Sequence, residues 1–119
     1  MVKFRLITDS HSEAVYHYYP EGDTEGYGII ILDKSDGSVR VEKTADNDSV
    51  RHITVDEQIK MRDGINKSRI NEGLKPFDDN EFTVISAYDV FFYATPASNK
   101  IVTSFEQGVL LNDGVVVWY

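Results

Sequence analysis

The chain has 119 residues, of which 20 are acidic and 12 are basic, so its formal net charge is −8. This length is typical of one domain that folds without a metal or disulfide. Because cysteine is absent, disulfides, thiol nucleophiles and cysteine-based metal sites are excluded. No apolar stretch is long enough to span a membrane, and none follows the first basic residues as in a secretory signal. We therefore expect a soluble, acidic, cytoplasmic domain.

The charge is unevenly distributed along the chain. Residues 1–50 hold ten acids and five bases, residues 51–75 hold four acids and six bases, and residues 76–119 hold six acids and one base. Phosphate binding depends on lysine and arginine, so the overall balance predicts no direct contact with nucleic acid. An acidic surface favours a protein partner that has a basic surface, or serves solubility alone.

The first 44 residues have the pattern of an antiparallel meander. Alternating or continuous apolar residues predict strands over residues 2–8, 13–19, 27–32 and 38–44. Asp36-Gly37, between the third and fourth of these segments, is a strong hairpin signal. We expect the third strand to be central and buried on both faces.

The middle of the chain predicts a helix from about residue 55 to residue 72. Thr54 and Glu57 have the spacing of a capping box, Gly73 suits a left-handed C-terminal cap, and Pro76 prevents continuation. The apolar face of this helix is thin, so we expect it to be peripheral or to pack on something outside the chain.

The last third predicts a strand, a helix and a final strand. Residues 82–93 are rich in aromatic and β-branched side chains, which favours a strand, bent at Asp89. Thr95-Pro96 resembles a helix N-cap followed by proline, and the four-residue spacing after it indicates an amphipathic helix. Residues 112–114 then form a turn into a strand over 115–119. The predicted fold class is α+β: an antiparallel sheet, a C-terminal helix on one face and a second, peripheral helix.

Two sets of residues are candidates for function. Asp9, His11 and Glu13 alternate in an extended segment that could present zinc or manganese ligands, whereas His17 and His52 suit a packed and a surface position. The exposed acidic loops and nearby tyrosines suit a protein-binding patch, because tyrosine is enriched at interface hot spots. The predicted partner-binding residues are Tyr19, Glu21, Asp23, Glu25, Tyr27, Asp78, Asp79 and Glu81.

Several short motifs stand out along the chain: Tyr18-Tyr19-Pro20-Glu21-Gly22, Gly28, Asp36-Gly37, Tyr93-Ala94, Ala97, Gly108 and the ending Gly114-Val115-Val116-Val117-Trp118-Tyr119. Together they resemble a group of short acidic proteins of Gram-positive bacteria and their phages. Against these shorter chains, residues 45–92 resemble an insertion within the single domain. The resemblance implies a phage or mobile-element origin and carries over no catalytic residue. Small acidic proteins of that origin are often inhibitors of defence machinery or immunity proteins.

The leading hypothesis is a non-enzymatic binding protein without a cofactor. It would neutralise a protein partner such as a nuclease or defence effector, its acids imitating phosphates and Tyr19 and Tyr27 acting as anchors. One alternative is a small-ligand or metal-binding module at the His11 loop. Another is an oligomeric scaffold assembled through residues 115–119 or the thin-faced helix; the sequence does not determine the oligomeric state.

Overall fold

The computed structural model describes residues 1–118, and the chain folds as two compact units. The sheet unit comprises Met1–Val50 and Phe91–Tyr119, and the helix unit comprises Arg51–Val90. The helix unit lies within the segment 45–92, which the resemblance predicts to be an insertion. Among residues 1–118, no helix has the length and apolar character needed to cross a membrane.

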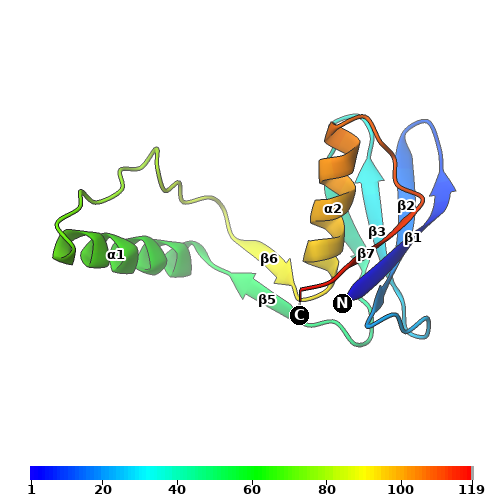
Figure 1. Ribbon diagram of the computed structural model, residues 1–119, viewed down its shortest axis with the longest axis horizontal. Helices are drawn as coiled ribbons and strands as arrows, with labels where there is room; N and C mark the ends of the chain where they lie inside the picture. The colour runs from blue at the N-terminus through cyan, green and yellow to red at the C-terminus, as the bar shows by residue number, and fades with distance from the viewer. Residues whose placement is uncertain (119) are drawn as a thin grey trace. The chain divides into compact units, whose positions relative to one another are not determined.

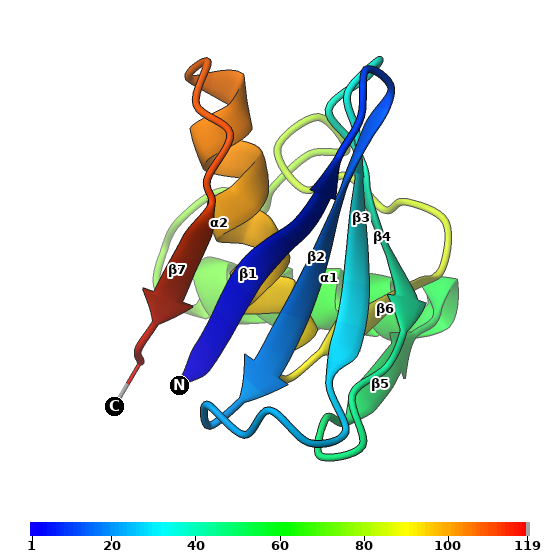
Figure 2. The same ribbon diagram turned by 90° about the vertical axis from the view of Figure 1, so that its right-hand side faces the viewer.

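The sheet unit is built on a five-stranded antiparallel sheet (Figure 2). Its strand order is β4-β3-β2-β1-β7, so the first four strands form the predicted meander and the last strand pairs with the first. The strands are β1 (Val2–Asp9), β2 (Glu13–Pro20), β3 (Gly28–Asp33), β4 (Val39–Lys43) and β7 (Asp113–Val116).

Helix α2 (Ala94–Glu106) packs on one face of this sheet, as Figure 1 shows. Alternate residues of each strand point toward the helix, because successive side chains of a strand point to opposite faces. The core consists of the buried side chains of Val2, Phe4, Ala14, Tyr16, Tyr18, Ile30, Leu32, Ala45, Ala94, Ala97 and Ile101. The predicted α+β class and the position of the C-terminal helix are confirmed.

The last strand begins earlier than the sequence predicts. Gly114 lies inside β7 opposite Phe4, and a Cβ atom at this position would lie 2.3 Å from Phe4 Cζ. The glycine therefore makes room for the Phe4 ring instead of forming the turn before the strand. Of the predicted strand over 115–119, residues 117 and 118 lie outside β7, and residue 119 lies outside the described residues.

The start of α2 also differs from the prediction. The helix begins at Ala94, and Thr95 lies within its first turn, where its Oγ1 accepts a hydrogen bond from Phe91 N (2.9 Å). The prediction of Thr95 as N-cap is therefore wrong. The first amide groups of the helix are satisfied instead by the carboxylate of Asp48, which is distant in sequence.

The helix unit contains helix α1 (Val55–Asn71), and its ends are as predicted. Thr54 caps the helix by accepting a hydrogen bond from Glu57 N (3.1 Å), and Gly73 after its end has φ +78°. β5 (Val50–Ile53) and β6 (Tyr88–Phe91) pair to form a short two-stranded sheet. β5 was not predicted, and the strand predicted over 82–93 is limited to β6.

Polar side chains attach the chain after α1 to the helix. The amide of Gln58 makes two hydrogen bonds with the backbone of Ile85, of 2.9 and 3.0 Å, and is the buried side chain of α1. The amide of Asn66 pairs in the same way with the backbone of Phe77. Each side-chain amide thus donates one hydrogen bond to the backbone of one residue and accepts another from it. These hydrogen bonds hold the segment after α1 against the helix, whose apolar face is thin.

Candidate protein-binding surface

Two loops of the sheet unit bring acidic residues together that are distant in sequence. The loop between β2 and β3 carries Glu21, Asp23 and Glu25, and the loop after β4 carries Asp46. Asp46 N donates to Gly26 O (2.9 Å), and a Cβ at Gly26 would lie 2.5 Å from Asp46 Oδ2. The absence of a side chain at Gly26 therefore permits the close approach. We call these four exposed acids the acidic end.

Local hydrogen bonds fix the conformation of the acidic end. Glu21 has φ +52°, and its Oε1 accepts hydrogen bonds from the Met1 amino group (3.0 Å) and Tyr93 Oη (3.1 Å). Asp23 Oδ1 accepts a hydrogen bond from Glu25 N (3.0 Å). The carboxylates of Glu21 and Asp23 are therefore held at the surface in a defined geometry, and ordering of this kind lowers the entropy lost on binding.

Asp48 lies in the same loop as Asp46 but has a structural role. Its two carboxylate oxygens accept hydrogen bonds from Tyr93 N (2.9 Å), Ala94 N (3.1 Å) and Tyr18 Oη (2.7 Å). A carboxylate at a helix N-terminus is favoured by the helix dipole and by the unpaired amide groups there. Burial raises the pKa of Tyr18 well above its usual range, so this phenol stays a donor to Asp48.

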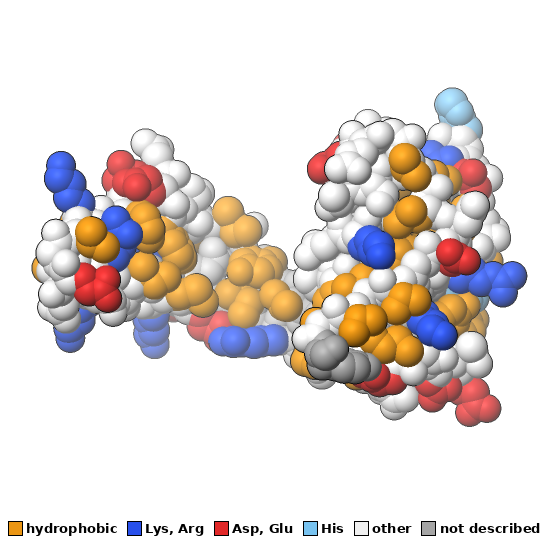
Figure 3. All heavy atoms as spheres, in the orientation of Figure 1, with side chains coloured by type: hydrophobic (Ala, Val, Ile, Leu, Met, Phe, Trp, Pro, Cys, Tyr) orange, Lys and Arg blue, Asp and Glu red, His pale blue; other side chains and the backbone are white. Residues whose placement is uncertain are grey.

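Three aromatic rings in mutual contact lie beside the acidic end. The centroids of Phe92, Tyr93 and Trp118 are 4.9 to 5.7 Å apart. Phe92 is 54% exposed and Trp118 is 41% exposed, and the Tyr93 hydroxyl reaches Glu21. Figure 3 shows hydrophobic side chains gathered near the N-terminal end of α2, with acidic side chains at the same end of the unit. We call these three residues the aromatic trio.

The tyrosines predicted as anchors lie outside the trio, Tyr19 in β2 and Tyr27 directly before β3. Tyr27 stacks on His17, with centroids 3.9 Å apart and planes inclined by 14°, and both residues are half-buried. Tyr19 is also half-buried, and its ring meets His17 edge-on. Burial and the positive charge of Lys43 lower the pKa of His17 below 6.5. His17 is therefore packed, as expected.

The other three predicted acids belong to the helix unit, in the segment after α1. Asp78 Oδ1 accepts hydrogen bonds from Asn80 N (2.9 Å) and Glu81 N (3.0 Å), and Asp79 pairs with Arg62 (3.2 Å). All three are exposed. They form a local acidic turn of their own unit, separate in the chain from Glu21, Asp23 and Glu25.

The structure does not bring Asp9, His11 and Glu13 together as metal ligands. Lys34 Nζ forms a salt bridge with Asp9, and Glu13 lies 3.8 Å from Arg40. Residues 1–118 contain no group of three histidine or acidic side chains arranged to hold a metal ion. His52 is exposed as predicted, and its Nδ1 lies 2.6 Å from Asp89 Oδ1.

Sequence reasoning missed the aromatic trio because its members come from separate segments. Phe92 and Tyr93 belong to the aromatic run that was assigned to a strand, and Trp118 was assigned to the last strand. The available signal was the density of aromatic residues at both sites, but their contact requires the pairing of β7 with β1.

No protein-family model matches the chain, and no match was found among curated proteins or solved structures. The resemblance to phage-associated proteins stays a prediction.

Proposed function

We propose that this protein acts by binding, and that the aromatic trio and the acidic end together engage a basic surface of a protein partner. The observation that carries the proposal is the contact of two well-exposed rings, Phe92 and Trp118, with Tyr93, whose hydroxyl reaches the acidic end. Aromatic side chains dominate binding energy at interfaces, while surrounding charges set the partner and the rate of encounter.

The chemistry of the partner follows from the charges. The sheet unit holds twelve acidic and six basic residues, and four of the acids form the acidic end. A partner that presents lysine and arginine around an apolar pocket complements this arrangement. Nucleic-acid enzymes and defence effectors present such surfaces in their substrate grooves, so neutralisation of one of these proteins is the proposed biological outcome. The carboxylates would then occupy phosphate positions.

The first experiment is capture of partners from a bacterial lysate on the immobilised protein, at about 50 mM and about 500 mM salt, since screening weakens exposed charge pairs. The captured protein is then purified and its affinity measured by titration. We expect one partner whose binding weakens as salt rises.

Variants of two kinds test the surface itself. Asp23→Lys with Glu25→Lys should reduce affinity about tenfold or more at low salt and flatten the salt dependence, since these acids speed encounter. Trp118→Ala should reduce affinity by a similar factor and leave the salt dependence unchanged. Asp63→Lys with Glu72→Lys, exposed acids of the helix unit, is the matched charge control. Equal affinity of all the variants would contradict the proposal.

A further inference from the structure

The face of the sheet opposite α2 carries residues that the proposed function does not use. This open face is turned toward the viewer in Figure 2, with α2 behind the sheet. One row of paired residues crosses four strands: Arg5 of β1 opposes His17 of β2, His17 opposes Ile29 of β3, and Ile29 opposes Lys43 of β4. In the next row, Lys3 opposes Tyr19.

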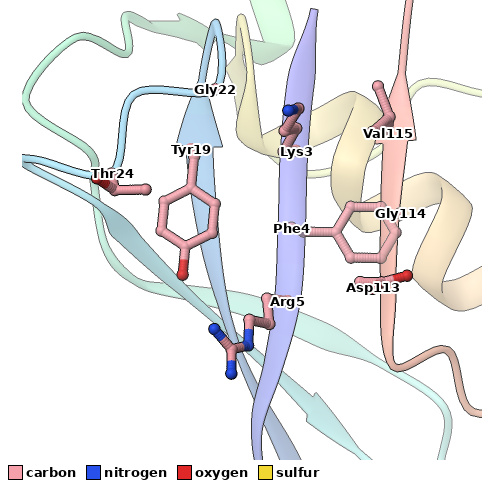
Figure 4. Close-up of a pocket in the computed structure, with 9 residues that line it drawn as sticks. All are labelled: Lys3, Phe4, Arg5, Tyr19, Gly22, Thr24, Asp113, Gly114 and Val115. Atoms are coloured by element: carbon pink, nitrogen blue, oxygen red, sulfur yellow. The ribbon is translucent and has the colours of Figure 1, made fainter.

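A pocket of about 400 Å³ opens on this face between β1, β7 and the loop after β2. The residues that line it include Lys3, Phe4, Arg5, Tyr19, Thr24 and Asp113, which Figure 4 draws as sticks. The volume lies within the range of pockets that hold small molecules or single bases. The pocket therefore combines two cations, one carboxylate, the buried ring of Phe4, the more accessible ring of Tyr19 and the hydroxyl of Thr24.

Three cations of the open face have no carboxylate partner. In the described part of the chain, Lys3, Arg5 and Lys43 form no salt bridge, whereas Arg40 is paired with Glu13 and Glu42. Asp113 of β7 lies opposite Arg5 in the register, so the three cations share this face with one acid, in a unit with twice as many acids as bases. Three strand spacings separate Arg5 from Lys43, which corresponds to about 14 Å across the sheet.

The aromatic residues of this face have different availability. Tyr27 is stacked on His17, and Lys43 Nζ lies 4.5 Å from the centroid of its ring, so Tyr27 orients these two neighbours. Tyr19 meets His17 only by an edge contact and lines the pocket. Tyr19 is therefore the ring that can take a planar group in the pocket.

We propose that the open face binds single-stranded nucleic acid, with one base in the pocket against Tyr19, flanking phosphates on Lys3 and Arg5, and the strand continuing toward Lys43. Exposed sheets that combine aromatic rings with a row of cations bind single strands, because unstacked bases are accessible there. Asp113 and Thr24 can accept hydrogen bonds from the N–H groups of a base, such as N3–H of thymine. The net charge of the chain predicts no contact with nucleic acid. The sheet, however, brings the side chains of Lys3, Arg5 and Lys43, which form no salt bridge among the described residues, to one face.

Fluorescence anisotropy tests this inference with a labelled oligothymidine of about eight nucleotides, a length suited to one binding domain. We expect saturable binding. The logarithm of the association constant should fall with the logarithm of the salt concentration with a slope of about −2, because three phosphate contacts release about 0.7 counterions each. Lys3→Gln with Arg5→Gln should weaken binding about tenfold and reduce the slope to about −0.7. The matched control, Lys60→Gln with Lys67→Gln, removes two exposed cations from the helix unit and should have little effect.

A second variant separates stacking from charge. Tyr19→Leu should weaken oligothymidine binding about tenfold with the salt slope unchanged, since the variant removes the stacking of one base and no charge. Equal losses in the double variant and its control, or duplex DNA bound as tightly as the single strand, would overturn the proposal. Thymidine monophosphate bound as tightly as the oligonucleotide would also overturn it, in favour of a free-nucleotide site. Melting curves of the variants confirm that each is folded.

Discussion

The two units of this protein obtain their structure in different ways. The sheet unit packs alternate apolar residues of five strands against α2, and its core contains two fully buried tyrosines, Tyr16 and Tyr18. The helix unit buries Ile53 and the polar Gln58, and side-chain amides tie its returning segment to α1. Apolar burial is the dominant favourable contribution to folding, so we expect the sheet unit to be much the more stable.

The same difference separates the units in function. Both the aromatic trio with the acidic end and the pocket of the open face belong to the sheet unit, whose rigid strands hold them in place. The segment 51–75 carries an excess of basic residues, but the helix unit as a whole has eight acids and six bases. Asp79 pairs with Arg62, so part of that basic charge is neutralised within the unit. An excess of charge along a segment therefore does not by itself define a surface.

The sharpest test of the comparison is to add one methyl group to a glycine of each unit. A Cβ at Gly28 would lie 2.0 Å from Tyr18 Cε1 and 2.8 Å from Ala45 N, whereas nothing lies within 4 Å of a Cβ at Gly64 in α1. Gly28→Ala should destabilise the sheet unit by about 3 kcal/mol or more. Gly64→Ala should stabilise α1 by up to about 1 kcal/mol. Denaturant unfolding followed by tryptophan fluorescence and circular dichroism measures both.

Removal of the charge at Asp48 should have the next largest effect. In Asp48→Asn, an amide group would face donors at Tyr18, Tyr93 and Ala94 that now share four lone pairs of a carboxylate, at a cost of about 2–3 kcal/mol. The aromatic trio should loosen with it, because Tyr93 belongs to both arrangements. Chemical denaturation reports the stability, and the near-ultraviolet dichroism of the trio reports its order. Unchanged stability would show that the α2 N-terminus needs no carboxylate.

The buried tyrosines should make the sheet unit sensitive to alkali. Burial, and secondarily the charge of Asp9, raise the pKa of Tyr16 from 10.0 to about 12. Between these two pH values the folded protein keeps the Tyr16 proton, whereas the unfolded chain releases it. The contribution of Tyr16 to the free energy of unfolding is therefore complete below pH 10 and is lost as the pH rises through about 12. It amounts to roughly 2–3 kcal/mol.

Tyr16→Phe is the variant that tests this contribution. It loses the hydrogen bond to Leu111 O (2.6 Å), which costs about 1 kcal/mol at neutral pH. Its unfolding free energy should then fall less steeply than that of the parent protein between pH 10 and about 12. Parallel curves for the two proteins would contradict the assignment. The helix unit has no fully buried tyrosine among its described residues and should show no such alkaline transition.

The smallest effect is expected from the helix unit. Gln58→Met keeps the volume but removes both hydrogen bonds to Ile85, at a local cost of about 1–2 kcal/mol. Hydrogen exchange should accelerate at residues of α1 and at Ile85 and stay unchanged in β1 to β3. Acceleration of exchange throughout both units would show that they unfold together and would break the comparison.

Local patterns predicted the regular elements well. The alternation in residues 2–19 identified β1 and β2, and Thr54 and Gly73 marked both ends of α1 because helix caps depend on neighbours only a few residues away. The errors occurred where the partner is distant. β5 was not predicted, residues 82–87 were predicted as strand and form none, and the helix start at Ala94 depends on Asp48, 46 residues earlier.

The sequence by itself determined the α+β class, the meander, both helices and the acidic net charge, since all of these depend on composition or short-range periodicity. The tertiary structure alone decided which side chains meet. It placed Phe92 and Tyr93 against Trp118, joined Asp46 to the loop of Glu21, and collected Lys3, Arg5 and Lys43 on one face. The physical reason is that a binding surface is defined by strand register and loop approach, and both are fixed by contacts between residues far apart in the chain.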